Sequence, residues 1–178
     1  MKNMKFVLHF VFLFCCFYIT KAEQTLYQHV FQHPLSKVDG LVSNEVNCML
    51  QDSKGFMWFG TNNGLSRYDG NSFKVYKSNY LKPLFFTDNM IHCLVEDHNS
   101  RLWIGTEKGI NMIDLETEKV TRFDNELRNY AINSMAVSAD KVLYLGTSNG
   151  LFYYDNETNS FVNIKIDGFA QKDNTTYI

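Results

Sequence analysis

The sequence is poor in the residues that cross-link or interrupt a chain, with two prolines and four cysteines among 178 residues. Cys15 and Cys16 lie in an apolar N-terminal stretch, which leaves only Cys48 and Cys93 in the rest of the chain. Small secreted domains that depend on disulfides carry several pairs of cysteines. A disulfide scaffold is therefore excluded.

Long hydrophobic runs are also missing, apart from one at the N-terminus that runs from Phe6 to Ile19 after Lys2 and Lys5. About fourteen residues are too few to cross roughly 30 Å of hydrocarbon comfortably as a helix. A basic start, a short apolar run and a small residue at Ala22 are typical of a signal peptide. We predict a signal peptide over residues 1–22; a retained membrane anchor is the alternative, and a lipidated cysteine is disfavoured.

Clusters of basic residues are absent after residue 22. Without the predicted signal peptide the chain has 14 Lys and Arg against 19 Asp and Glu. Phosphate recognition needs clustered positive charge. The composition therefore predicts no nucleic acid partner and disfavours anionic partners in general.

The sequence does contain an internal repeat, in which the segment from Asp52 to Asp69 returns at 97–114 and again at 138–155. The offsets are 45 and 41 residues, and a period of this length indicates propeller blades or helical repeats. The repeated positions form the signature Asp52, Trp58, Gly60, Thr61, Gly64, Asp69; Asp97, Trp103, Gly105, Thr106, Gly109, Asp114; and Tyr144, Gly146, Thr147, Gly150, Asp155.

Each repeat contains short runs rich in β-branched and aromatic residues, which favour strands over helices. In the first repeat we expect strands at Val46 to Gln51, Phe56 to Thr61, Leu65 to Asp69 and Phe73 to Lys77. Four strands make one propeller blade. The second run is apolar at successive positions, so both of its faces must be covered, as they are when blades pack face to face.

The sequence therefore predicts an all-β propeller with three four-stranded blades, taken from a ring of about seven. A strand within 25–33 is expected to close the ring by joining the last blade. The predicted boundaries are 1–22 for the signal peptide, 23–41 for the closing strand and lead-in, 42–82, 83–127 and 128–168 for blades 1 to 3, and 169–178 for the start of a fourth blade. A truncated reading frame or a fragment is suspected.

Cys48 and Cys93 stand one repeat apart, on corresponding strands of neighbouring blades. Sheets stack about 10 Å apart, whereas a disulfide needs Cα atoms within about 7 Å. We expect two buried free thiols.

The signature at 52–69, Asp-Ser-x-Gly-x-x-Trp-x-Gly-Thr-x-x-Gly-Leu-x-x-Tyr-Asp, resembles the two-component regulator propeller repeat. The lead-in at 39–46 resembles the approach to a first blade in that family, and the departures are Ser100, Lys141 and Tyr144. The resemblance implies the N-terminal periplasmic part of a hybrid sensor histidine kinase of the Bacteroidetes type, which senses oligosaccharides. It also implies an inner-membrane parent whose remaining blades and signalling domains are the partners, with a homodimer only in the full-length receptor.

No residue is predicted to be catalytic, to bind a cofactor or to ligate a metal, and no cofactor is expected. Trp58, Trp103 and Tyr144 can stack on sugars, but their repetition favours packing between blades. Asp52 and Asp97 end strands where a carboxylate accepts bonds from the backbone of the turn. The ligand-binding residues are unknown; a ligand surface is expected in the variable loops at 80–87 and 125–130.

Three functions stay open at this point. The first is a ligand-sensing ectodomain without chemistry of its own. The second is a fragment of a secreted propeller enzyme acting on glycans, similar to a sialidase or a lyase. The third is a propeller for protein interactions, which the fold alone does not exclude.

Overall fold

The computed structural model describes residues 35–78, 86–123 and 127–165. The predicted signal peptide, the predicted closing strand and the predicted start of a fourth blade lie outside these residues. Ser36 to Ile178 belong to one compact unit, and the described strands all lie within it.

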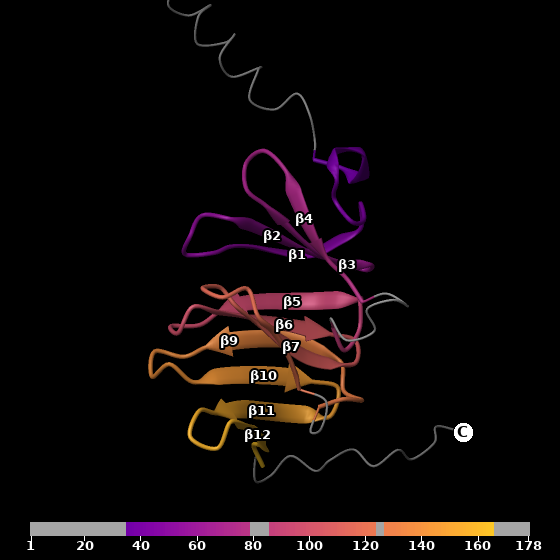
Figure 1. Cartoon of the computed structure of the whole chain (residues 1–178). Coiled ribbons are helices and arrows are strands. Elements are labelled where there is room, and N and C mark those ends of the chain that lie inside the picture. The colour runs from indigo at the N-terminus through magenta and orange to yellow at the C-terminus, as the bar shows by residue number, and fades with distance from the viewer. Residues whose placement is uncertain (1–34, 79–85, 124–126, 166–178) are drawn as a thin grey trace, which may run out of the picture. The chain divides into compact units, whose positions relative to one another are not determined.

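The described residues form three four-stranded antiparallel sheets, in agreement with the predicted all-β propeller blades (Figure 1). Each sheet is a meander in which strands pair in chain order, and we call the sheets blades 1, 2 and 3. Blade 1 contains β1 (Val46–Gln51), β2 (Met57–Thr61), β3 (Gly64–Tyr68) and β4 (Phe73–Tyr76). Blade 2 contains β5 (Ile91–Glu96), β6 (Arg101–Thr106), β7 (Gly109–Asp114) and β8 (Val120–Phe123). Blade 3 contains β9 (Ile132–Val137), β10 (Leu143–Thr147), β11 (Gly150–Asp155) and β12 (Ser160–Asn163).

The four strands predicted for blade 1 are confirmed to within one residue at each end. In every blade, the pairing between the first and second strands contains a β-bulge. The bulge follows the first residue of the first strand, where one extra residue has no partner on the second strand. These bulged residues are Asn47, His92 and Asn133. The bulge is therefore part of the repeat, as expected of a bulge that redirects side chains.

Two hydrophobic cores lie between the blades, one between blades 1 and 2 and the other between blades 2 and 3. Strand β6 contributes side chains to both cores, because Leu102 and Ile104 belong to the first core and Trp103 belongs to the second. We call the face of a blade that carries the equivalents of Leu102 and Ile104 its leading face, and the face that carries the equivalent of Trp103 its trailing face. Both faces of the sheet are thus buried at β6, which explains why its apolar residues follow one another without polar residues between them.

A short segment in front of each inner strand carries one buried apolar side chain that anchors the segment to its blade. These anchors are Leu41, Phe86 and Leu127, which are at most 4% exposed. Before the first anchor lies a 3-10 turn, η1 (Lys37–Asp39), which was not predicted; Ser36 caps it through a capping box with Asp39.

Within the described ranges, no helix is long and apolar enough to cross a membrane.

Candidate functional site: the repeat signature and the blade interfaces

The aspartate and the tryptophan of the signature are hydrogen-bonded to each other in blade 1. Asp52 Oδ2 accepts from Trp58 Nε1 at 2.7 Å, and both residues are buried. Asp52 Oδ1 accepts from the backbone N–H groups of Lys54 at 3.0 Å and Phe56 at 2.9 Å. The predicted turn role of Asp52 is therefore present, and the bond to the indole is an addition that the sequence did not reveal.

Blade 2 repeats this arrangement and adds a cation. Asp97 Oδ2 accepts from Trp103 Nε1 at 2.7 Å and from Arg101 Nε at 2.7 Å. The Arg101 guanidinium lies 5.2 Å from the centre of the Trp103 ring and donates to Asn156 of blade 3 at 2.8 Å. All acceptor positions of this aspartate serve the blade itself, which agrees with a structural role.

Blade 3 changes both members of the pair together, with Ser138 in place of the aspartate and Tyr144 in place of the tryptophan. Ser138 Oγ keeps one bond of the turn, accepting from the N–H of Val142 at 3.2 Å. A phenol ring has no indole N–H that would need a buried carboxylate. Loss of the indole therefore removes one of the aspartate's two roles, and Ser138 retains part of the other, the bond within the turn.

The predicted packing role of the three aromatic residues holds for two of them. Trp58 and Trp103 are fully buried in the two cores between blades. Tyr144 is 36% exposed, because it lies on the trailing face of blade 3, which no described residue covers. For Tyr144 the expectation of packing between blades is not met within the described residues.

The Gly-Thr-x-x-Gly part of the signature builds the hairpin between the second and third strands. Thr61 Oγ1 donates to the carbonyl of Gly64 at 2.8 Å and accepts from the N–H of Asn63 at 3.0 Å. Gly64 has φ +126°, which an L side chain rarely adopts. The same two threonine bonds recur from Thr106 and Thr147.

The last aspartate of each signature caps the outer hairpin. Asp69 Oδ1 accepts from the N–H groups of Asn71 at 2.8 Å and Ser72 at 2.7 Å. Bonds from the Ser72 and Asn71 backbones lower the pKa of Asp69, and backbone and side-chain bonds in the corresponding turns lower the pKa values of Asp114 and Asp155. These carboxylates hold turns and are not arranged for proton transfer.

Two glycines of the signature make room for the next blade. A Cβ on Gly60 would lie 2.5 Å from Cys48 Sγ and 2.7 Å from Ile91 Cγ2 of blade 2. A Cβ on Gly105 would meet Cys93 and Ile132 of blade 3 in the same way. We call this gap the glycine notch: the first residue of each following blade fills the notch of the blade before it.

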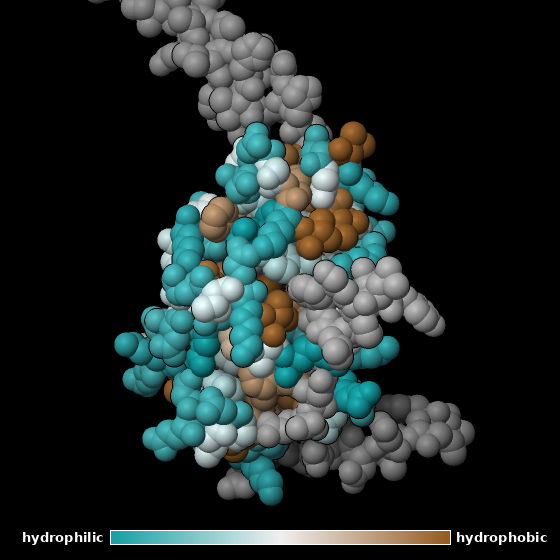
Figure 2. Space-filling view, viewed as in Figure 1, coloured by the Kyte–Doolittle hydropathy of each residue, from teal (hydrophilic) through white to brown (hydrophobic). Residues whose placement is uncertain are grey.

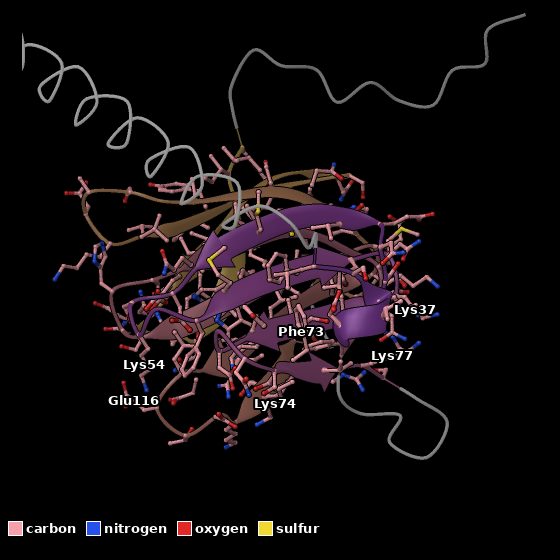
Figure 3. All side chains as sticks on the ribbon, turned by 90° about the horizontal axis from the view of Figure 1, so that it is seen from above. Lys37, Lys54, Phe73, Lys74, Lys77 and Glu116 are labelled. Carbon is pink, nitrogen blue, oxygen red and sulfur yellow. The ribbon has the colours of Figure 1, made fainter. Side chains whose placement is uncertain are left out.

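A turn of blade 2 also makes ion pairs with three residues of blade 1, a contact that we call the clasp. Glu118 pairs with Arg67 at 2.7 Å and with Lys74, and Lys54 reaches Glu116 at 3.0 Å. Figure 3 shows Lys54, from the turn between β1 and β2, beside Glu116, whereas Lys74 lies on β4. Both lysines are partly exposed, so this clasp contributes to the contact between blades mainly through Arg67, which is better buried.

Cys48 and Cys93 are free thiols, as predicted, although they are partly rather than completely buried. Burial raises the pKa of Cys48 to about 11 and that of Cys93 to about 12. A nucleophilic cysteine needs a lowered pKa. These two thiols therefore behave as small apolar residues of the trailing faces.

The loops expected to carry a ligand surface are described only in part, at 86–87 and 127–130. Phe86 and Leu127 within them are buried anchors, whereas Arg128 and Asn129 are exposed. The anchors repeat at the offsets of the signature, a signal that sequence comparison could have found. Among the described residues, no group of three His, Cys, Asp or Glu is placed to hold a metal.

The family comparison agrees with this arrangement. The family model described as "Two component regulator propeller" matches residues 40–63 and 86–108, the stretches that carry the lead-ins, inner strands and notches of blades 1 and 2. Over these two stretches the chain is similar to the two-component regulator propeller family. The matched stretches hold Asp52 and Asp97 with their indole partners.

Solved structures of similar proteins agree with this match. The extracellular domain of a hybrid two-component system from B. thetaiotaomicron is 25% identical with a TM-score of 0.68, covering 74% of this chain and 20% of that one. A second such domain from the same bacterium is 26% identical with a TM-score of 0.60, covering 73% of this chain and 18% of that one. Virginiamycin B lyase of Staphylococcus aureus, at 19% identity and a TM-score of 0.51, shows a likeness of fold alone.

Among curated proteins, the chain is similar to "Histidine kinase P4" of Formosa agariphila, with 43% identity over 42 residues. That match covers 24% of this chain and 3% of the kinase. The chain thus spans only a small part of the proteins that it matches.

Proposed function

We propose that this chain is an extracellular, ligand-sensing propeller segment of a two-component sensor and performs no chemistry itself. The observation that carries the proposal is the match of the repeat to the regulator propeller family, together with the likeness to extracellular domains of two hybrid two-component systems. The signature carboxylates, threonines and indoles are engaged in bonds that hold the blades, which supports a scaffold rather than an enzyme.

We further propose an oligosaccharide as the ligand, with neutral sugars favoured by the excess of 19 acidic over 14 basic residues outside the predicted signal peptide. The test is a thermal-shift and calorimetry screen of the complete receptor against neutral and anionic oligosaccharides. A saturable response to a neutral oligosaccharide is expected. No response across the panel, or release of sugar fragments during incubation, would contradict the proposal.

The proposed place in a receptor has a separate test that needs no protein. Sequencing the DNA downstream of the codon for Ile178 should reveal further blades, a membrane helix and a histidine kinase motif. A downstream region encoding a glycan hydrolase or lyase would favour the enzyme alternative instead.

A further inference from the structure

The two ends of the blades use their polar side chains differently. At the end that carries the turns between the first and second strands, polar groups bind the next blade. The N–H of Ser53 donates to Glu96 of blade 2 at 2.7 Å, as Arg101 does to Asn156 of blade 3. Hydrophilic side chains cover most of these turns, which lie on the left in Figure 2. We call the opposite end, where the bulges lie, the bulge end.

At the bulge end, His92 departs from the role that its position has in blade 1. Asn47, the equivalent residue, donates from its side-chain amide to the carbonyl of Ile91 in the next blade at 2.8 Å. His92 instead lies with its Nε2 2.8 Å from Glu107 Oε2 of its own blade. These two side chains are 27% and 49% exposed, and ion pairs at such exposure add little to stability. Neither packing between blades nor stability therefore explains this pair.

Three more side chains of blade 2 lie at the same end. The carbonyl of Met90, a residue that is 40% exposed, accepts from the N–H of Glu107 at 3.0 Å. Lys108 Nζ lies 3.6 Å from Asp88 Oδ2. We call Asp88, Met90, His92, Glu107 and Lys108 the blade 2 cluster; two carboxylates, one ammonium group and one imidazole leave it close to neutral. Blades 1 and 3 both pack against blade 2, so the cluster is exposed at the end of a blade and not on an uncovered face.

The segment that precedes β5 is held in place by two sets of hydrogen bonds. The N–H of Thr87 donates to Oδ1 of Asn111, a fully buried residue, at 2.9 Å. The side chain of Asn89 donates to the carbonyl of Ser78 at 3.0 Å and accepts from its N–H at 2.8 Å. Asn89 stands between the two cluster members that precede β5, so these are positioned before any ligand arrives. A preformed site avoids the entropic cost of ordering its groups on binding.

We propose that the blade 2 cluster is a binding subsite for one sugar unit of a neutral oligosaccharide. Sugar hydroxyl groups both donate and accept hydrogen bonds, so adjacent hydroxyls match the acceptor oxygens of Glu107 and a ring nitrogen of His92. Met90 offers an apolar surface for the C–H face of the sugar ring, as expected where a few polar groups border an apolar lining. The near-neutral charge of the cluster suits a ligand without charge. This inference rests on the proposed sensing function and gives its ligand a place on the chain.

Calorimetry of the complete receptor with maltohexaose, laminarihexaose, xylohexaose and mannohexaose tests the subsite. Glu107→Asn should weaken binding of the probe that binds by about tenfold or more, because a charged acceptor of its hydroxyl groups is lost. Asn62 stands at this position in blade 1, so the substitution is compatible with the fold.

The matched control is Glu157→Asn, which removes the same charge at the opposite end of a blade. It also introduces the residue of blade 1, because Asn71 and Glu157 occupy the same place in their turns, each donating its N–H to the aspartate that caps the turn. The control should leave the affinity unchanged. An equal loss in Glu107→Asn and Glu157→Asn would show an effect of overall charge and would overturn the subsite.

Two further substitutions examine the other contacts. His92→Asn introduces the residue of blades 1 and 3, and Met90→Ala introduces the residue of blade 3, Ala131. Each should weaken binding by about threefold or more, and circular dichroism melts establish that each variant is folded. Wild-type affinity in these variants and in Glu107→Asn would overturn the subsite and leave the sensing proposal standing. A wild-type receptor that binds none of the four probes would contradict the neutral oligosaccharide as ligand, and the subsite with it.

Discussion

The carboxylate of Asp52 and the indole of Trp58 are joined by a buried hydrogen bond of 2.7 Å. The bond ties the turn after β1 to the residue that fills the core between blades 1 and 2. It therefore couples the geometry of a turn within one blade to the packing between two blades.

This coupling predicts a non-additive double-mutant cycle. Asp52→Ala should lower the free energy of unfolding by about 2–3 kcal/mol, because it leaves a buried indole N–H and two turn N–H groups without their acceptor. Trp58→Phe should also destabilise, since it leaves the carboxylate short of a donor. Urea unfolding of both single variants and the double variant gives the coupling energy. Independent effects, summing to that of the double variant, would show that the bond contributes nothing specific.

The glycine notch predicts a difference between two chemically identical substitutions. Gly105→Ala should destabilise by about 1–3 kcal/mol, because its Cβ would overlap Cys93 and Ile132 in a packed core. Gly146→Ala meets only the Ser134 hydroxyl within its own blade and should cost less. Chemical denaturation of the two variants makes the comparison. Equal losses would mean that the notch is not what constrains the position.

The raised pKa values of the two thiols predict that they react slowly with thiol reagents and that the fold loses stability at alkaline pH. Folding raises the pKa of Cys48 to about 11 and of Cys93 to about 12, against an ordinary value of 9.0. The folded state thus holds the thiol protons more tightly, so the contribution of these two thiols to stability is constant well below pH 9 and falls as the pH rises through 9.0 to the folded pKa values. Thiol-reagent kinetics at pH 8 should be far slower for the folded chain than in urea. The alkaline slope should shrink in Cys48→Ser with Cys93→Ser.

A backbone conformation in blade 3 predicts a stabilising substitution. Lys141 has φ +65°, whereas Gly55 occupies the corresponding turn position of blade 1 with φ +88°. A non-glycine residue pays conformational strain in this region, and Lys141→Gly should therefore raise the free energy of unfolding by up to about 1 kcal/mol. Thermal or urea unfolding checks the sign. Asp140→Gly, next to it in the turn, is the control and should not stabilise.

The fold could be predicted from the sequence because the patterns that specify strands and turns span only a few residues and recur in each repeat. Alternation and turn residues placed the four strands of blade 1 within one residue, and the successive apolar residues around Trp58 correctly indicated blades packed face to face. These features depend on neighbours within a few positions.

The contacts that the sequence did not reveal join residues on different strands or blades. The bond from Trp58 to Asp52, the entry of Ile91 into the Gly60 notch and the clasp by Glu118 depend on which side chains face each other across a sheet or an interface. Tyr144 shows the converse: its repeat position predicted packing, but its exposure depends on whether another blade covers that face, which no local pattern encodes.

The glycine notch also suggests how propellers with different numbers of blades can evolve. The gap and the aliphatic side chain that fills it recur at both contacts between described blades, so a duplicated repeat inherits both halves of this contact at once. Copying a segment of 41 to 45 residues adds a blade without requiring any new recognition to evolve. The unit on which selection for ring size acts is therefore the whole repeat.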